Sequence, residues 1–150
     1  MFFAFIFANI FFPASLLAAE NMANYDMNDL EILAKESNFR EFLRHAHDVR
    51  PSKRDNRWIQ IVSDMAQGLI AAEENKNNYT QTNILYFDTL LTWPSLKSDE
   101  LFLFYRNRYS LDYLNQCFKN NKDINYCKNK LKNIWGRTPS PNRFPDFGAN

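Results

Sequence analysis

Residues 53–75, KRDNRWIQIVSDMAQGLIAAEEN, carry an apolar side chain at every third or fourth position. The repeating residues are Trp58, Ile61, Val62, Met65, Ala66, Leu69 and Ala72. This spacing aligns side chains along one face of an α-helix, as in an amphipathic helix that packs on a core. Pro51 and Ser52 precede the stretch and suit a first turn and an N-cap, and the polar run NKNN at 75–78 ends it. We therefore predict a long helix over residues 53–75.

The segment before this helix also has a helical pattern. Residues 29–49 are expected to form one helix with a break near Ser37, or two short helices. Two pairs of residues have the spacing of a capping box, namely Asn28 with Glu31 and Asn38 with Glu41. Each pair predicts the start of a helix.

Further helices are expected downstream, each beginning after a residue whose side chain can cap a helix. Thr80 or Thr82 would begin the first of them, and Pro94 would stop it. The caps of the next three are Ser98, Ser110 and Asp123. Only three glycines occur in 150 residues, which favours helices over a sheet with tight turns. The sequence predicts an all-α fold, a compact bundle of about six short-to-medium helices.

The first nineteen residues, MFFAFIFANIFFPASLLAA, carry no charged side chain and end in small residues. This pattern is typical of a secretory signal peptide cleaved before Glu20, although no Lys or Arg precedes the apolar run. An uncleaved membrane anchor is the alternative, which Asn9 and Pro13 in mid-segment disfavour. We expect a signal peptide at 1–19, a helical domain at 20–136 that ends at Gly136, and a Pro-rich tail or linker at 137–150.

The charge of the chain is nearly balanced, with 18 basic and 17 acidic residues and a formal net charge of +1. Dedicated nucleic-acid-binding proteins show a strong basic excess, so we expect no nucleic acid among the partners. The charges are nonetheless sorted into blocks, with basic residues in excess at 40–57 and 101–135. We expect a protein or an anionic envelope component as partner, and a membrane only if the signal segment stays uncleaved.

Cys117 and Cys127 are the two cysteines of the chain and lie ten residues apart. They fall near the end of one expected helix and the start of the next. An antiparallel helical hairpin brings such positions within disulfide distance, and an exported chain meets oxidising conditions. We predict a structural disulfide, with two buried free thiols in a cytosolic chain as the alternative.

The motif HAHD contains His45 and His47, which are the only histidines in the sequence. A zinc site needs three or four converging ligands. On a helix, residues two positions apart point in nearly opposite directions, so both side chains could reach one ion only in an extended segment. We expect no metal site here and no cofactor, and we expect the two histidines to lie near the end of a helix.

The stretch RPSKRDNRW places Arg50, Lys53, Arg54 and Arg57 before the long predicted helix. Free backbone N–H groups at a helix start attract anions, so these side chains are candidates for an anion site or for contact with an anionic partner. The alternative is structural, with Asp48 and Asp55 pairing with the arginines and holding a corner between two helices.

The segment FYRNRYSLDY spaces Tyr105, Tyr109 and Tyr113 four residues apart, so the three rings share a helix face if Ser110 does not break the helix. An exposed stripe of this kind can stack on sugar rings or on nucleic-acid bases. The same spacing is typical of a face that points into the core. We keep Tyr105 and Tyr109 as candidate binding residues, with the core as the alternative.

The tetrapeptide ESNF at 36–39 is similar to the stretch around the catalytic glutamate of lysozyme-like lytic transglycosylases. The resemblance covers these four residues and implies that Glu36 would act as a general acid in an apolar pocket. The Gly-rich segment that follows in that family is absent, because Gly68 is the one glycine in residues 40–70.

Taken together, these patterns favour an exported small helical protein, periplasmic or extracellular, that binds a partner without catalytic activity. A divergent glycan-cleaving domain that uses Glu36 is the first alternative. A membrane protein held by an uncleaved signal segment is the second.

Overall fold

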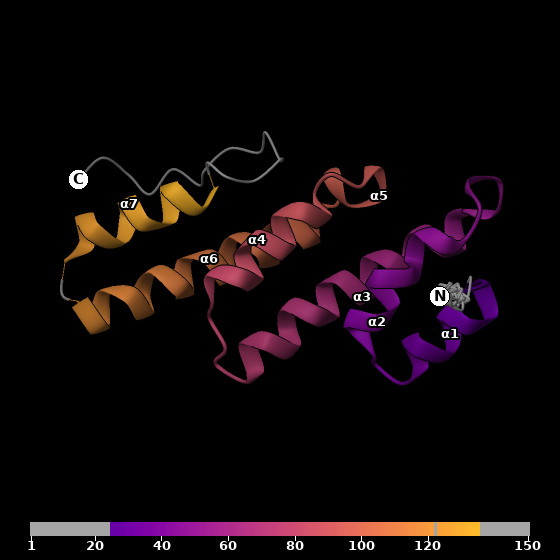
Figure 1. The fold of residues 1–150 in the computed structure, drawn as a ribbon, viewed down its shortest axis with the longest axis horizontal. Helices are drawn as coiled ribbons and strands as arrows, with labels where there is room; N and C mark the ends of the chain where they lie inside the picture. Colours follow the sequence, from indigo (N-terminus) through magenta and orange to yellow (C-terminus); the bar gives the residue numbers. More distant parts are fainter. Residues whose placement is uncertain (1–24, 122, 136–150) are drawn as a thin grey trace, which may run out of the picture.

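The structure, a computed structural model, describes residues 25–121 and 123–135, and every regular element in that part of the chain is a helix (Figure 1). The α-helices are α1 (Met27–Lys35), α2 (Phe39–His45), α3 (Asn56–Asn75), α4 (Gln81–Leu90), α5 (Pro94–Lys97), α6 (Glu100–Asn121) and α7 (Ile124–Trp135). Two short 3₁₀ turns, η1 (Ala46–Asp48) and η2 (Pro51–Lys53), join α2 to α3. The predicted all-α bundle is confirmed. The expected signal peptide at 1–19, Gly136 and the tail at 137–150 lie outside the described residues.

The long helix predicted from the apolar stripe is α3, and it forms the centre of the bundle. It packs against α1, α2, α5 and α6. Five residues of the predicted stripe are buried, namely Trp58, Val62, Met65, Ala66 and Leu69. Ile61 and Ala72 are half-buried. The helix begins later than predicted, because Asp55 is the N-cap and accepts a hydrogen bond from Trp58 N (3.0 Å), while Pro51 and Ser52 lie in η2.

Residues 29–49 form two short helices, which is the second of the two predicted arrangements. The break comes at Ser37, whose φ of 54° is left-handed. The first helix starts at a different capping box, since Asp26 is the N-cap and Asp29 reaches back to its N–H group. Asn38 lies at the N-cap position of α2 as expected, but its side chain makes no capping hydrogen bond.

The helices after α3 confirm some predicted starts and correct others. Thr80 caps α4 as expected, with Oγ1 accepting from Asn83 N (3.2 Å). The helix ends at Leu90, and Pro94 opens the short α5 instead of stopping α4. The side chain of Asp99, and not that of Ser98, caps the next helix by accepting from Phe102 N (2.9 Å).

The predicted helix start at Ser110 is wrong, because α6 runs without a break from Glu100 to Asn121. Ser110 is buried in its middle, and its hydroxyl donates to the carbonyl oxygen of Arg106 (3.0 Å). A serine hydroxyl that bonds four residues back is accommodated inside a helix. The predicted cap of α7 is confirmed, since Asp123 Oδ1 accepts from Tyr126 N (3.0 Å).

The α6–α7 corner is closed by the predicted disulfide between Cys117 and Cys127, whose Cα atoms are 5.8 Å apart. Both cysteines are buried. Residues 25–121 and 123–135 contain no helix with the length and apolar character that a bilayer span requires.

Candidate functional site

The joint between α2 and α3 is held by Arg54, one of the four predicted anion-binding residues. Its Nε donates to the carbonyl oxygen of Val49 and its Nη2 to that of His47, both at 2.8 Å. The guanidinium also lies over the ring of Trp58, with its Cζ 5.2 Å from the ring centre. Arg54 therefore has a structural role, because its side chain donates hydrogen bonds to the backbone of the joint.

Aromatic rings fix the other side of the joint. The indole N–H of Trp58 donates to the carbonyl oxygen of Ala46 (3.0 Å), and the ring of His47 contacts Trp58 and Trp93, with centroids 5.8 and 4.1 Å apart. Partial burial lowers the pKa of His47, the charge of Arg54 lowers it further, and Asp48 opposes both. The lowered pKa favours the neutral form of His47, which suits a ring in contact with two indoles.

His45 points to a different set of partners. Its Nδ1 lies 2.8 Å from Asp48 Oδ2 and its Nε2 lies 3.2 Å from Glu41 Oε1, while its ring stacks on Tyr25 at 4.0 Å. The two histidines lie near the end of α2, as predicted. The described residues contain no cluster of three or more His, Cys, Asp or Glu side chains able to hold a metal ion.

The predicted pairing of Asp48 and Asp55 with the arginines is wrong. Asp48 accepts a hydrogen bond from His45, and Asp55 caps α3. Arg57 instead pairs with Glu31 across the α1–α3 contact, at 2.7 Å. The structural interpretation of this stretch therefore holds for Arg54 and Arg57, but through contacts with the backbone and with α1.

Arg50 and Lys53, the remaining two basic residues, line a groove of about 730 Å³ between the start of α1 and the joint. Both side chains are exposed, and neither forms an ion pair with a described residue. The other residues lining the groove are Tyr25, Asp26, Met27, Asn28, Asp48, Val49 and Asp55. The groove thus brings together two free cations and the N-caps of two helices, α1 and α3.

The three carboxylates of this groove already have partners. Asp26 accepts from two backbone N–H groups of α1, at 2.8 and 3.0 Å. Asp55 accepts from the first turn of α3, and Asp48 accepts from His45 and, at 3.4 Å, from the N–H of Tyr25. Since these acids are engaged, Arg50 and Lys53 are the groove's available charged groups.

The predicted tyrosine stripe lies mostly in the core. Tyr109 is 0% exposed and Tyr113 is buried, while Tyr105 is half-buried beneath Arg108, whose Cζ lies 4.9 Å from its ring centre. The full burial of Tyr109 excludes it from an exposed binding platform. The core alternative is therefore correct for this residue, and its hydroxyl has a structural role.

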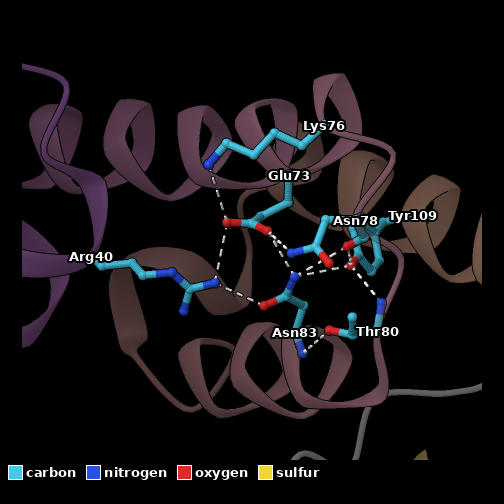
Figure 2. A network of polar contacts seen from close by, with 7 residues as sticks. All are labelled: Arg40, Glu73, Lys76, Asn78, Thr80, Asn83 and Tyr109. Carbon is cyan, nitrogen blue, oxygen red and sulfur yellow. Dashed lines mark hydrogen bonds and ion pairs between the residues drawn. The ribbon is translucent and has the colours of Figure 1, made fainter.

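Figure 2 shows that role in a polar network between α2, α3, α4 and α6. The hydroxyl of Tyr109 donates to the carbonyl oxygen of Asn78 and accepts from Thr80 N (2.9 Å) and Asn83 Nδ2 (3.1 Å). Asn83 Nδ2 also donates to Glu73 (3.1 Å), and Asn83 Oδ1 accepts from Arg40 (2.8 Å). The network joins four helices through side chains far apart in the sequence.

Glu73 is the charged centre of this network and is only 5% exposed. Burial raises the pKa of Glu73, but hydrogen bonds from Asn78, Asn83 and Arg40 together outweigh it, so that the pKa lies below its usual value of 4.5. Each carboxylate oxygen has partners, including Lys76 at 3.9 Å. Glu73 is therefore an ionised, fully bonded group that holds helices together. The role of Glu73 was not predicted from the sequence. Its position four residues after Leu69 places it on the buried face of α3, which would have indicated a buried polar contact.

Glu36, the candidate general acid, is exposed at the C-cap of α1. A catalytic glutamate of that type needs an apolar pocket, which keeps its proton bound near neutral pH. The exposed position of Glu36 lacks this environment and does not support the lytic alternative.

Comparison with known proteins gives no relative for this chain. No protein-family model matches it, and neither a curated protein nor a solved structure matches it.

Proposed function

We propose that this chain is an exported, non-enzymatic binding protein that captures an acidic segment of a partner protein in the groove beside the α2–α3 joint. The observation that carries the proposal is the pair Arg50 and Lys53. Both are exposed and free of ion pairs with described residues, and both line one groove of about 730 Å³. Charged side chains left free beside a concave surface are available to a partner.

The mixed character of the groove favours a protein segment over a polyanion. Asp26, Asp48 and Asp55 line the same groove as the two cations, so a ligand with dense negative charge would meet three carboxylates. Met27 and Val49 add apolar surface to the lining. Interfaces between proteins combine apolar contact with a few polar pairs in this way. An acidic segment that also carries apolar side chains satisfies both parts of the groove.

Export is supported by the pairing of the two cysteines. Disulfides form and persist in oxidising compartments and are rare in the cytosol. The Cys117–Cys127 disulfide accounts for both cysteines of the sequence. We place the protein in the periplasm or outside the cell.

The binding proposal is tested with a fluorescently labelled peptide that carries two Glu residues among Leu, Ser and Gly, titrated by fluorescence anisotropy at low and high salt. We expect saturable binding that weakens with salt. The charge-reversal variant R50E/K53E should lose roughly tenfold or more in affinity, because each free cation is replaced by a like charge. The control K97E/K132E changes the net charge equally on exposed residues of α5 and α7, and should bind as the wild type does.

Circular dichroism checks that both variants keep the wild-type fold, which is expected because none of the four side chains is buried. If the wild type does not bind the peptide, or if the control loses as much affinity as R50E/K53E, the groove is not the binding site and the proposal fails.

A further inference from the structure

A second apolar stripe runs along the outward face of α6. Leu101, Phe104, Leu111 and Phe118 are 56%, 57%, 40% and 44% exposed. With Arg108 and Asn115 included, the stripe occupies positions 101, 104, 108, 111, 115 and 118, which are separated by three and four residues in turn. This is the heptad spacing of helices that pack against a second helix over more than two heptads.

The core formed by the described residues does not include this stripe. The opposite face of α6 supplies the buried side chains, among them Phe102, Tyr109, Tyr113 and Cys117. That face packs against α3, α4 and α7, and Figure 1 shows α7 running along one side of α6. The outward stripe therefore remains as apolar surface with heptad order, which scattered surface leucines would not show.

We infer that the α6 stripe binds a second copy of this chain, with the two α6 helices antiparallel. The pattern is self-complementary about the midpoint between residues 109 and 110. In an antiparallel pair, Leu101 lies level with Phe118 of the second copy, and Arg108 lies level with Leu111. A two-fold symmetric interface requires such self-complementarity, because the same patch serves both molecules.

The charges select the antiparallel direction. Arg108 is ion-paired with Glu74 of its own chain, but a parallel pair would still bring the two guanidinium groups level with each other, whereas the antiparallel pair sets each one level with Leu111 of the second copy. The ends of the helix are also complementary, since Glu100 stands at the start of α6 and Lys119 in its last turn. Like charges opposed at a seam are destabilising, and opposite charges set the orientation of paired helices.

The size of the stripe predicts a weak, reversible dimer. Counting about 200 Å² for each large apolar side chain, the four side chains expose roughly 400 Å² per molecule. A pair buries roughly twice that, which is below the ~1,200 Å² of a standard stable interface. Self-association in the micromolar range or weaker follows, so that monomer and dimer coexist.

The association is measured by sedimentation equilibrium of the purified protein from about 5 to 500 µM. We expect a concentration-dependent monomer–dimer equilibrium, which L111K weakens roughly tenfold or more because it places a second cation level with Arg108 of the second copy at the centre of the seam. The control I32K makes the same kind of change at Ile32, which is 53% exposed on α1. It should leave the equilibrium unchanged. A wild type that stays monomeric over this range, as it would if residues of its own chain covered the stripe, overturns the proposal, and so does equal weakening by both variants.

Direction is tested with a short bismaleimide cross-linker. Residues 101 and 118 are ~25 Å apart along one helix, so L101C molecules of an antiparallel dimer hold their new thiols too far apart to be joined. A mixture of L101C and F118C should cross-link efficiently, and L101C alone should not. Efficient cross-linking of L101C alone would show a parallel pair and overturn the antiparallel assignment.

Discussion

The buried ion pair between Asp88 of α4 and Arg106 of α6 gives the sharpest test of how this bundle is held together. Both side chains are 1% exposed and joined through Arg106 Nη2 and Asp88 Oδ1. Burial lowers the pKa of Arg106, and the charge and hydrogen bond of Asp88 raise it again. Asp88 therefore supplies a buried counter-charge to the guanidinium, whose Nη1 also donates to Asn107 Oδ1 (3.0 Å). The substitution D88N removes that charge while keeping the shape of the side chain.

We expect D88N to lower the free energy of unfolding by about 3–5 kcal/mol, the usual cost of removing one partner of a buried ion pair. For about 110 described residues, the entropy of unfolding is roughly 0.23 kcal/mol/K, so the melting temperature should fall by roughly 13–22 °C. The control E31Q breaks the Glu31–Arg57 pair, whose arginine is 66% exposed, and should cost less than about 1 kcal/mol.

The assay is urea denaturation followed by circular dichroism, with thermal melts as a second probe. The double variant D88L/R106M should recover most of the stability lost in D88N, because an apolar pair of similar volume often replaces a buried ion pair without loss. A loss below about 1 kcal/mol in D88N would refute the reasoning. So would a double variant that is as unstable as the sum of D88L and R106M, since the two groups would then act independently.

Three further outcomes are expected. The pKa of Glu73 is lowered in the folded state, so its ionised form contributes to the free energy of unfolding above a pH of about 4.5. This contribution is lost as the pH falls through the folded pKa. Urea denaturation of E73Q at a series of pH values should not show this loss of stability at acid pH. R54Q should destabilise the protein by about 1–3 kcal/mol because it removes two hydrogen bonds to the joint, whereas R57Q should cost less than about 1 kcal/mol, both measured by the same melts. The intact mass of the natively expressed protein should begin at or near Glu20 and rise by about two daltons on reduction; a full-length mass would instead support an anchored protein.

Local patterns in the sequence were sufficient for most of the helices. Trp58, Val62 and Leu69 lie on one face of any regular helix, so their burial follows from spacing alone. Cys117 and Cys127 were also predictable, because a hairpin corner leaves few other positions for them. The prediction for Ser110 was wrong because serine occurs both at helix caps and inside helices. Here its hydroxyl bonds to the carbonyl oxygen of Arg106, and the helix continues through it.

The site was predictable only in part, since its contacts join residues distant in sequence. For Arg54 and Arg57 the sequence predicted either an anion-binding role or a structural role. The spacing of residues does not show which partners they contact, namely the backbone for Arg54 and α1 for Arg57. The pairing of Arg40 with Asn83, 43 residues away, likewise requires the fold. Arg50 and Lys53 became the stronger candidates only when the structure showed which cations form no ion pair within residues 25–121 and 123–135.

The Cys117–Cys127 bridge turns the corner between α6 and α7 into a closed covalent ring. A protease that cuts one peptide bond within this ring opens it without releasing a fragment, and α7 stays attached to the rest of the molecule. Such a nicked protein would migrate as intact on a non-reducing gel and fall into two pieces only after a thiol is added. Turnover that begins at this corner would therefore need a reductant as well as a protease.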